Sequence, residues 1–110
     1  MTAYNAVRFR VRPGMERDFE AAIRQEMQAG FPGLAKAVLI KTGEQTYCEI
    51  GEWDSYDSIV AARPAMIAGL DKVRHMLEEL GDGLGVTDAV SGQAVATFVR
   101  GGGESVQPTA

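Results

Sequence analysis

Two arginines at alternate positions near the start of the chain are the first residues whose type and spacing could do chemistry. Arg8 and Arg10 share one side of a segment with a period of two, so their guanidinium groups point the same way. A guanidinium group offers paired N–H donors that match a carboxylate or a phenolate. Two interpretations stay open: the pair anchors an anionic ligand, or it forms ion pairs that set the register between two subunits.

A second set of candidate residues alternates along positions 45–53. Tyr47, Glu49 and Trp53 share one side of this segment, where Glu49 is expected to pair with the two arginines. The two aromatic rings either anchor a core or interface, or stack on an aromatic ligand. Asn5, the only asparagine, either orients a substrate enolate or makes a hydrogen bond at a strand end. The ligand-binding candidates are therefore Asn5, Arg8, Arg10, Tyr47, Glu49 and Trp53.

The only histidine and the only cysteine are weaker candidates. On a helical wheel His75 lies opposite the apolar stripe that contains Leu70 and Val73, so we expect it to face solvent. Cys48 is expected to be inert packing on the side of its strand that faces the helices. Because these two residues are far apart and have no further partners of their kind, we expect no metal site. No catalytic residue is assigned.

The composition narrows the class of protein. The chain has 110 residues and a net charge of −4, which argues against nucleic acid as a partner because that binding depends on clustered Lys and Arg. The first residues lack the layout of a signal peptide, and no apolar run is long enough to cross a membrane. We therefore expect a cytoplasmic protein with one domain over residues 1–100 and a disordered tail over 101–110.

The first half of the chain has clear periods. Residues 5–12 alternate as a strand, and Pro13-Gly14 ends it. Apolar residues at helical spacing then predict a helix over 15–29. The apolar run in 34–41 and the alternation in 45–53 predict two strands of a hairpin, joined by a turn at 42–44.

The second half predicts a helix and a strand. Asp54 or Ser55 can cap a short helical segment that reaches about residue 62. Pro64 is expected to start a second helical part, so that the whole is a kinked or two-part helix. An apolar stripe extends that part to Leu80, where Gly81 suits a C-terminal cap. Alternation over residues 93–100 predicts the final strand after a glycine-rich loop.

This order of strands and helices, β-α-β-β-α-β, predicts an α+β ferredoxin-like fold. Right-handed crossovers place both helices on one face of a four-stranded antiparallel sheet and leave the other face open. We expect that open face to be apolar and to carry Tyr47 and Trp53. A face of this kind predicts a twofold homodimer in which two sheets pack against each other.

Over about residues 4–100 the chain resembles a known group of proteins. Its strand order, the Arg12-Pro13-Gly14 exit from the first strand, and Glu52-Trp53-Asp54-Ser55 before a proline-started helix are similar to the dimeric α+β barrel superfamily, specifically the antibiotic-biosynthesis-monooxygenase-like domains. The resemblance implies a pocket between sheet and helices in each subunit. Members of this group often have a histidine where this chain has Ala61-Ala62-Arg63-Pro64. The haem-degrading members carry a tryptophan on the second helix, whereas the only tryptophan of this chain ends a strand. Haem degradation is therefore disfavoured.

Two classes of function remain open. The first is a monooxygenase-like enzyme that needs no cofactor and oxidises a small aromatic or quinol-type substrate, whose own carbanion reacts with dioxygen while Arg8 or Arg10 stabilises charge. The second is a non-catalytic module, either a small-ligand binder or a structural dimer. An enclosed cavity with at least two convergent polar groups would favour the first class, and a filled interior the second.

Overall fold

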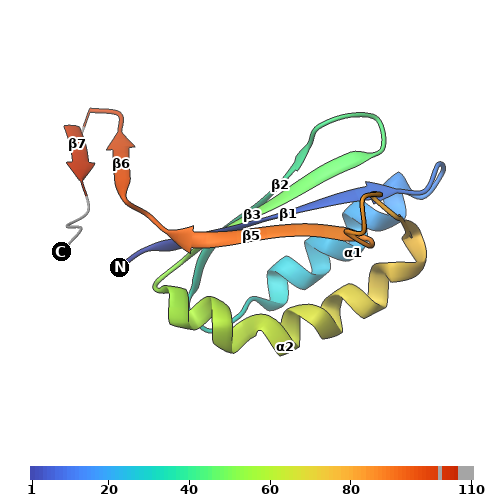
Figure 1. Ribbon diagram of the computed structural model, residues 1–110, viewed down its shortest axis with the longest axis horizontal. Coiled ribbons are helices and arrows are strands. Elements are labelled where there is room, and N and C mark those ends of the chain that lie inside the picture. Colours follow the sequence, from blue (N-terminus) through green and yellow to red (C-terminus); the bar gives the residue numbers. More distant parts are fainter. Residues whose placement is uncertain (102, 107–110) are drawn as a thin grey trace.

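A five-stranded antiparallel sheet with two helices on one of its faces forms the body of the protein, in a computed structural model that describes residues 1–101 and 103–106 (Figure 1). The elements are β1 (Ala3–Val11), α1 (Glu16–Ala29), β2 (Leu34–Lys41), β3 (Thr46–Trp53), α2 (Tyr56–Val73), a 3-10 turn (Arg74–Met76), β4 (Leu77–Glu78), β5 (Thr87–Gln93), β6 (Ala96–Val99) and β7 (Gly103–Val106). The predicted α+β ferredoxin-like fold is confirmed. No helix in the described residues is both long and apolar enough to cross a membrane.

The strands lie in the order β2-β3-β1, and the free edge of β1 pairs with two short partners. β5 pairs along most of β1, from Ala3 opposite Gln93 to Phe9 opposite Thr87, and β4 pairs with the last residues of β1. These two segments together occupy the place predicted for one final strand. The sheet therefore has five strands instead of the predicted four, and β4 and β5 share one edge position beside β1.

The first helix forms where its apolar period begins. Phe19 and Ile23 of α1 are buried against the sheet, and Glu16 accepts hydrogen bonds from the backbone of Gly14 at its start. Gly30 ends the helix with φ 68°, a left-handed conformation that glycine adopts without strain. The helix predicted over 15–29 is present one residue shorter.

The second helix is one continuous element. Ser55 caps it by accepting a hydrogen bond of 3.1 Å from the Ser58 backbone N–H, as its sequence predicted. Pro64 lies inside the helix, so the predicted division at this residue is wrong. Pro64 is exposed, and the carbonyl group one turn before it can therefore bond to water in place of the missing N–H.

This helix also ends earlier than its apolar stripe predicted. It stops at Val73, and a 3-10 turn leads into β4, where Leu77 pairs with Val11 of β1. Leu77 is buried as expected of a stripe residue, but it reaches the core from a strand. His75 lies in the 3-10 turn with an exposed side chain, as predicted.

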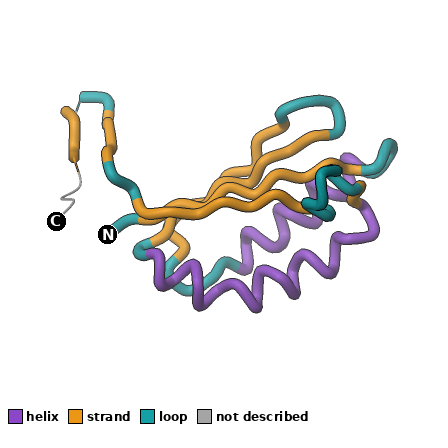
Figure 2. Tube along the Cα trace, in the orientation of Figure 1, coloured by secondary structure: helices purple, strands orange, loops and turns teal. Residues whose placement is uncertain are grey.

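The C-terminal segment departs most from the prediction. Residues 93–100 do not form the last strand of the sheet; that strand is β5, which begins at Thr87. β6 instead pairs with β7 in a separate hairpin, which extends beyond one end of the body near the N-terminus (Figures 1 and 2). Of the tail predicted to be disordered, Gly103–Val106 forms a strand, while residues 102 and 107–110 lie outside the described part of the chain.

Candidate functional site

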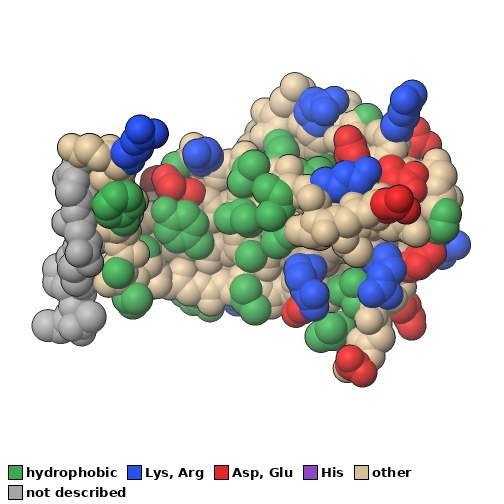
Figure 3. Space-filling view, turned by 90° about the horizontal axis from the view of Figure 1, so that it is seen from above, with side chains coloured by type: hydrophobic (Ala, Val, Ile, Leu, Met, Phe, Trp, Pro, Cys, Tyr) green, Lys and Arg blue, Asp and Glu red, His purple; other side chains and the backbone are tan. Residues whose placement is uncertain are grey.

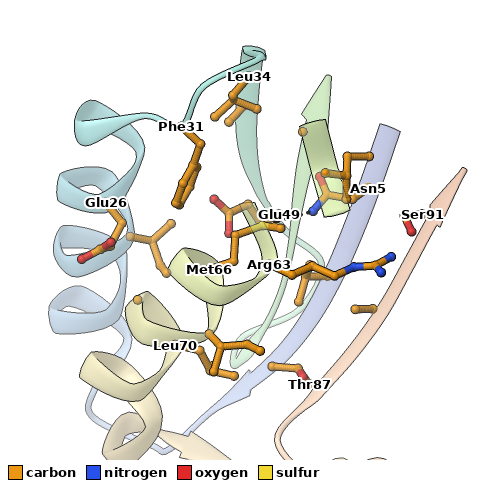
Figure 4. Close-up of a pocket in the computed structure, with 18 of the residues that line it drawn as sticks. Asn5, Glu26, Phe31, Leu34, Glu49, Arg63, Met66, Leu70, Thr87 and Ser91 are labelled. Atoms are coloured by element: carbon orange, nitrogen blue, oxygen red, sulfur yellow. Dashed lines mark hydrogen bonds between the residues drawn. The ribbon is translucent and has the colours of Figure 1, made fainter. Parts of the chain in front are cut away.

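An apolar cavity of about 430 Å³ lies between the sheet and the two helices. Its lining comes from four strands, both helices and the loop that follows α1 (Figure 4). Most of the wall is hydrocarbon, from Phe31 and Leu34 at one end to Leu70 and Val73 along α2. A pocket of this size with a few polar groups in an apolar wall is typical of small-molecule sites. The interior is therefore not filled by side chains.

One end of the cavity is built around a hydrogen bond between a strand amide and an indole. Trp53, at the end of β3, donates from Nε1 to Oδ1 of Asn5 on β1 over 2.8 Å. This bond turns the Asn5 Nδ2 group toward the sulfur of Met66 on α2, at 3.9 Å. Phe31 packs next to the indole, with ring centroids 6.0 Å apart. The arrangement leaves an oriented amide donor beside two aromatic rings.

Gly51 provides the space for that hydrogen bond. A Cβ atom on Gly51 would lie 2.5 Å from the Asn5 Oδ1 and 2.7 Å from the Trp53 Nε1. Both distances are shorter than any ordinary contact, so a side chain at this position would push the two groups apart. The glycine in the middle of β3 is thus part of the site.

Glu49 supplies a carboxylate in the middle of the cavity. It lies between Asn5 and the helices in the close-up view (Figure 4), half-buried, and its cross-strand neighbours are Val7 and Leu39. Burial, and to a smaller extent the negative charge of Glu26, raises the pKa of the Glu49 carboxyl above its ordinary value.

Glu26 of α1 is the second acidic residue of the lining. Its carboxylate accepts a hydrogen bond of 3.1 Å from Nζ of Lys72 on α2, in an ion pair whose lysine is exposed. Gly69 allows the two helices to approach here, because a Cβ at that position would lie 3.0 Å from a Glu26 oxygen. Glu26 therefore has a counterion, which Glu49 lacks among the described residues.

Polar groups from α2 and β5 gather at another part of the lining. Arg63 donates a hydrogen bond of 3.2 Å to the Tyr56 hydroxyl, and both Arg63 and Ser91 line the cavity. A hydrogen bond with Ser91, followed by the bond and charge of Arg63, lowers the pKa of the Tyr56 phenol. These contacts place a positive charge at the exposed side of an otherwise apolar space.

Three of the six predicted ligand-binding residues line the cavity: Asn5, Glu49 and Trp53. The faces of Glu49 and Trp53 were predicted wrongly, because both side chains point toward the helices and not to the open face of the sheet. The β1–β3 register explains this: Glu49 pairs with Val7, whereas Arg8 pairs with Cys48. Glu49 is therefore not the partner of Arg8 and Arg10.

Tyr47 also faces the helices, outside this cavity. Its ring lies in the core against Phe19, with centroids 5.0 Å apart, and its hydroxyl donates to Glu20 over 2.6 Å. Burial, then the bond with Glu20, raises the pKa of Tyr47 far above its ordinary value. The ring is a core anchor, and the prediction that it lies on the open face is wrong.

The two arginines do lie on the open face, as predicted, but each has another partner. Arg8 donates two hydrogen bonds to Asp88 of β5, the shorter of 2.6 Å, and Arg10 donates to the carbonyl of Glu79 over 3.3 Å. Cys48 and Ile50 share this face, which corrects the prediction that Cys48 meets the helices. Neither arginine lines the cavity.

The sequence interpretation missed Glu26, Arg63, Thr87 and Ser91 as cavity residues. A signal for Glu26 was present, since it lies three residues after the buried Ile23 and so places a charge on the apolar face of α1. Thr87 was taken for part of a loop and Ser91 for a turn or bulge, so neither could be found in this way. No group of three or more His, Cys, Asp or Glu suited to a metal ion occurs in the part of the chain that is described.

Comparison with known proteins shows what the fold is shared with. No family model and no curated protein sequence matches the chain. Among solved structures, the cofactor-independent oxygenase SnoaB from Streptomyces nogalater is similar with a TM-score of 0.69 at 18% identity, over 88% of this chain and 96% of that one. A putative antibiotic biosynthesis monooxygenase from Bordetella bronchiseptica has a TM-score of 0.67 at 20% identity, over 86% and 97%. A putative antibiotic biosynthesis monooxygenase from Chloroflexus aurantiacus has a TM-score of 0.67 at 16% identity, over 92% of this chain and 100% of that one.

These likenesses cover nearly all of each neighbour. At identities of 20% or less they show a common fold. The predicted resemblance to antibiotic-biosynthesis-monooxygenase-like domains is thereby confirmed for the architecture. A shared fold does not determine the reaction, which depends on the residues of the cavity.

Proposed function

We propose that this protein is a monooxygenase-like enzyme that oxidises a small electron-rich aromatic or quinol with dioxygen, using no metal or flavin. The observation that carries the proposal is the cavity of about 430 Å³, whose mainly apolar lining includes the polar residues Asn5, Glu49 and Arg63. A cavity with a few polar groups in an apolar wall favours an enzyme over a module with a filled interior. The shared fold with SnoaB, a cofactor-independent oxygenase, supports the same class.

The proposed reaction needs only the substrate and dioxygen. A methylene carbon next to an electron-rich ring loses a proton, and the resulting carbanion adds dioxygen to give a peroxide. Protonation of the peroxide and loss of water leave a carbonyl group, so that CH2 and O2 become C=O and H2O. The substrate supplies the electrons, and the protein has to bind it, orient it and hold charge.

The residues of the cavity suit those tasks. Phe31 and Trp53 offer aromatic surface to a ring. Asn5 Nδ2, which makes a weak hydrogen bond to the sulfur of Met66, can donate to a substrate oxygen on which negative charge develops. Arg63 adds a positive charge at the side of the cavity. These two residues take the charge-stabilising role that was expected of Arg8 and Arg10.

We also propose that two copies pair through their open sheet faces. Apolar side chains gather on that face in the view opposite the helices (Figure 3). Cross-strand neighbours place Ala6, Val38, Ile40, Ile50 and Val90 there, together with the Arg8–Asp88 ion pair. An apolar sheet surface of this extent is typical of an association site. The two sheets would then enclose the ion pairs and leave each cavity within its own subunit.

The fluorescence of Trp53, the only tryptophan, allows a direct test. Anthrone, a three-ring compound with an acidic CH2, and 1,4-dihydroxynaphthalene, a two-ring quinol, serve as probes. We expect both to quench Trp53 and at least one to be oxidised with stoichiometric uptake of dioxygen, at a rate that dialysis against a chelator does not change. Quenching without oxygen uptake by either probe would instead support the alternative, a non-catalytic ligand-binding module.

A further inference from the structure

Glu49 stands out among the groups of the cavity because its surroundings do not stabilise its charge. It projects from the middle of β3 into the cavity, and both of its cross-strand neighbours, Val7 and Leu39, are apolar. Figure 4 shows its side chain close to Met66 of α2, on the same side of the sheet as Asn5. An ionised carboxylate in such a setting loses much of its hydration.

The other charged groups of the lining are already engaged. Glu26 on α1 pairs with Lys72, and Arg63 on α2 donates to Tyr56. The lining residues of β1, β2 and β5 carry no charge. Within residues 1–101 and 103–106, no hydrogen bond or ion pair to the Glu49 carboxylate is found, and the nearest charge that acts on it is the repulsive one of Glu26.

A carboxyl group in this position is suited to proton transfer. Burial raises its pKa above the ordinary value, which makes the carboxylate a better proton acceptor. It also faces the same space as the Asn5 amide and the two aromatic rings, so a bound ring would lie between the base and the donor. An apolar side chain on β3 would fill the cavity equally well, which means that packing alone does not require a glutamate here.

We propose that Glu49 is the catalytic acid–base residue of this cavity: it removes the acidic proton of the substrate and later returns it to the peroxide oxygen. This inference rests on the proposed function. In the first step the carboxylate takes the proton of the methylene group, and the C–H electron pair stays on carbon. In the second step the carbanion and dioxygen, the oxidant, form a C–O bond. The protonated Glu49 then gives its proton to the terminal oxygen, which yields a hydroperoxide. The remaining C–H proton leaves the carbon, its electron pair forms the C=O bond as the O–O bond breaks, and the departing hydroxide combines with that proton as water.

The proton step can be measured without oxygen. Anthrone is incubated with the full-length protein in D2O under anaerobic conditions, and loss of its methylene proton signal is followed by NMR. We expect the wild-type protein to accelerate the exchange and Glu49→Gln to lower that acceleration by roughly 10²- to 10⁴-fold, the usual contribution of a general base. Quenching of Trp53 by anthrone should change by less than about threefold in this variant, since the amide keeps the shape of the side chain.

Two further variants make the comparison sharp. Glu44→Gln removes a carboxylate from the exposed turn before the same strand, and its exchange rate should equal that of the wild type. Glu49→Asp keeps the acid but withdraws it by one methylene group, so partial exchange is expected. The wild-type rate should rise with pH as the carboxylate ionises, along a limb that lies above the ordinary carboxyl range and is absent in Glu49→Gln.

The outcomes separate the two proposals. Exchange that is unchanged in Glu49→Gln overturns the role of Glu49, while oxygen uptake by the same sample would leave the oxygenase standing. Exchange that depends on Glu49 without oxygen uptake in air supports Glu49 as the base and overturns the oxygenase. A wild-type protein that binds anthrone and exchanges no proton overturns Glu49 as a base.

Discussion

At the scale of single residues, the candidate site depends on a glycine, Gly51, as much as on its charged side chains. Gly51 carries no group that could bind a ligand, yet it permits the hydrogen bond between Asn5 and Trp53. That bond fixes the amide, which is the oriented neutral donor of the cavity. The geometry of this end of the site therefore rests on a missing side chain.

Replacing Gly51 with alanine should separate Asn5 from Trp53. We expect a loss of about 1–3 kcal/mol in the free energy of unfolding, the usual cost of an added methyl group in a packed region, and weaker quenching of Trp53 by anthrone. Urea denaturation and the fluorescence titration measure the two effects. Gly92→Ala on β5 is the matched control, because a Cβ there meets nothing within 4 Å; equal losses in both variants would refute the role of Gly51.

The raised pKa of Glu49 predicts how stability depends on pH. A carboxyl whose pKa is higher in the folded state than in the unfolded state opposes folding when ionised, and this cost disappears below the unfolded pKa. Glu49→Gln should therefore be more stable than the wild type at pH 7, and the difference should shrink as the pH falls toward 4. Urea midpoints at several pH values test this. A variant that is less stable than the wild type at pH 7 contradicts the assigned environment.

At the scale of elements, the first half of the chain could be predicted and the second could not. Strands β1, β2 and β3 and helix α1 were found within two residues of their ends because each has one clear period. The stripe of α2 continued past Val73 in the sequence, but Leu77 meets the core from a strand after a 3-10 turn. Sequence periodicity indicates which side chains are buried. Here it did not show whether Leu77 is buried from a helix or from a strand, because both would place it in the core.

The edge strand and the faces of β3 were missed for related reasons. β5 is an edge strand with mixed small and polar residues, so its alternation is weak, while the stronger alternation of residues 94–99 belongs to the separate hairpin. Positions 47–53 have apolar residues on both faces. Bulk decides between them, because Tyr47 and Trp53 fill the space beneath the helices better than Cys48 and Ile50 do. Size was the available signal for this choice.

The proline within α2 gives a prediction for this element. Pro64 is exposed and breaks one backbone hydrogen bond of an otherwise continuous helix. Pro64→Ala should restore that bond and raise the free energy of unfolding by about 1–3 kcal/mol. Pro32→Ala, in the exposed turn after α1, should give no such gain. Thermal unfolding of the two variants makes the comparison, and a lower midpoint for Pro64→Ala would show that the helix needs the proline.

At the scale of the whole molecule, the open face of the sheet determines how copies of the chain meet. The helices cover one face only (Figure 1), and on the other face Val38 and Ile40 are 40% and 41% exposed in a single subunit, while Ile50 is half-buried. Burying these side chains against a second copy would remove them from water without a change of fold. The Arg8–Asp88 pairs would then be desolvated at the interface.

A charge on this apolar face should keep the subunits apart. Val38 is 40% exposed in the single subunit, and Val38→Asp would place a carboxylate between the two sheets. We expect a dimer for the wild type and a monomer for this variant at micromolar concentration in equilibrium sedimentation. Val60→Asp on α2, where the valine is 43% exposed, should remain dimeric. A monomeric wild-type protein would remove the sheet-to-sheet interface.

The hairpin of β6 and β7 extends away from the body and should affect the solubility of the protein at high concentration. Val95 is 65% exposed and Phe98 75% exposed, and β6 has its main contacts with β7 alone. Exposed apolar side chains on a projecting hairpin contact neighbouring molecules before the rest of the surface does. Concentrated samples should therefore cluster through this hairpin first, and polar replacements there would improve solubility while the cavity is left untouched.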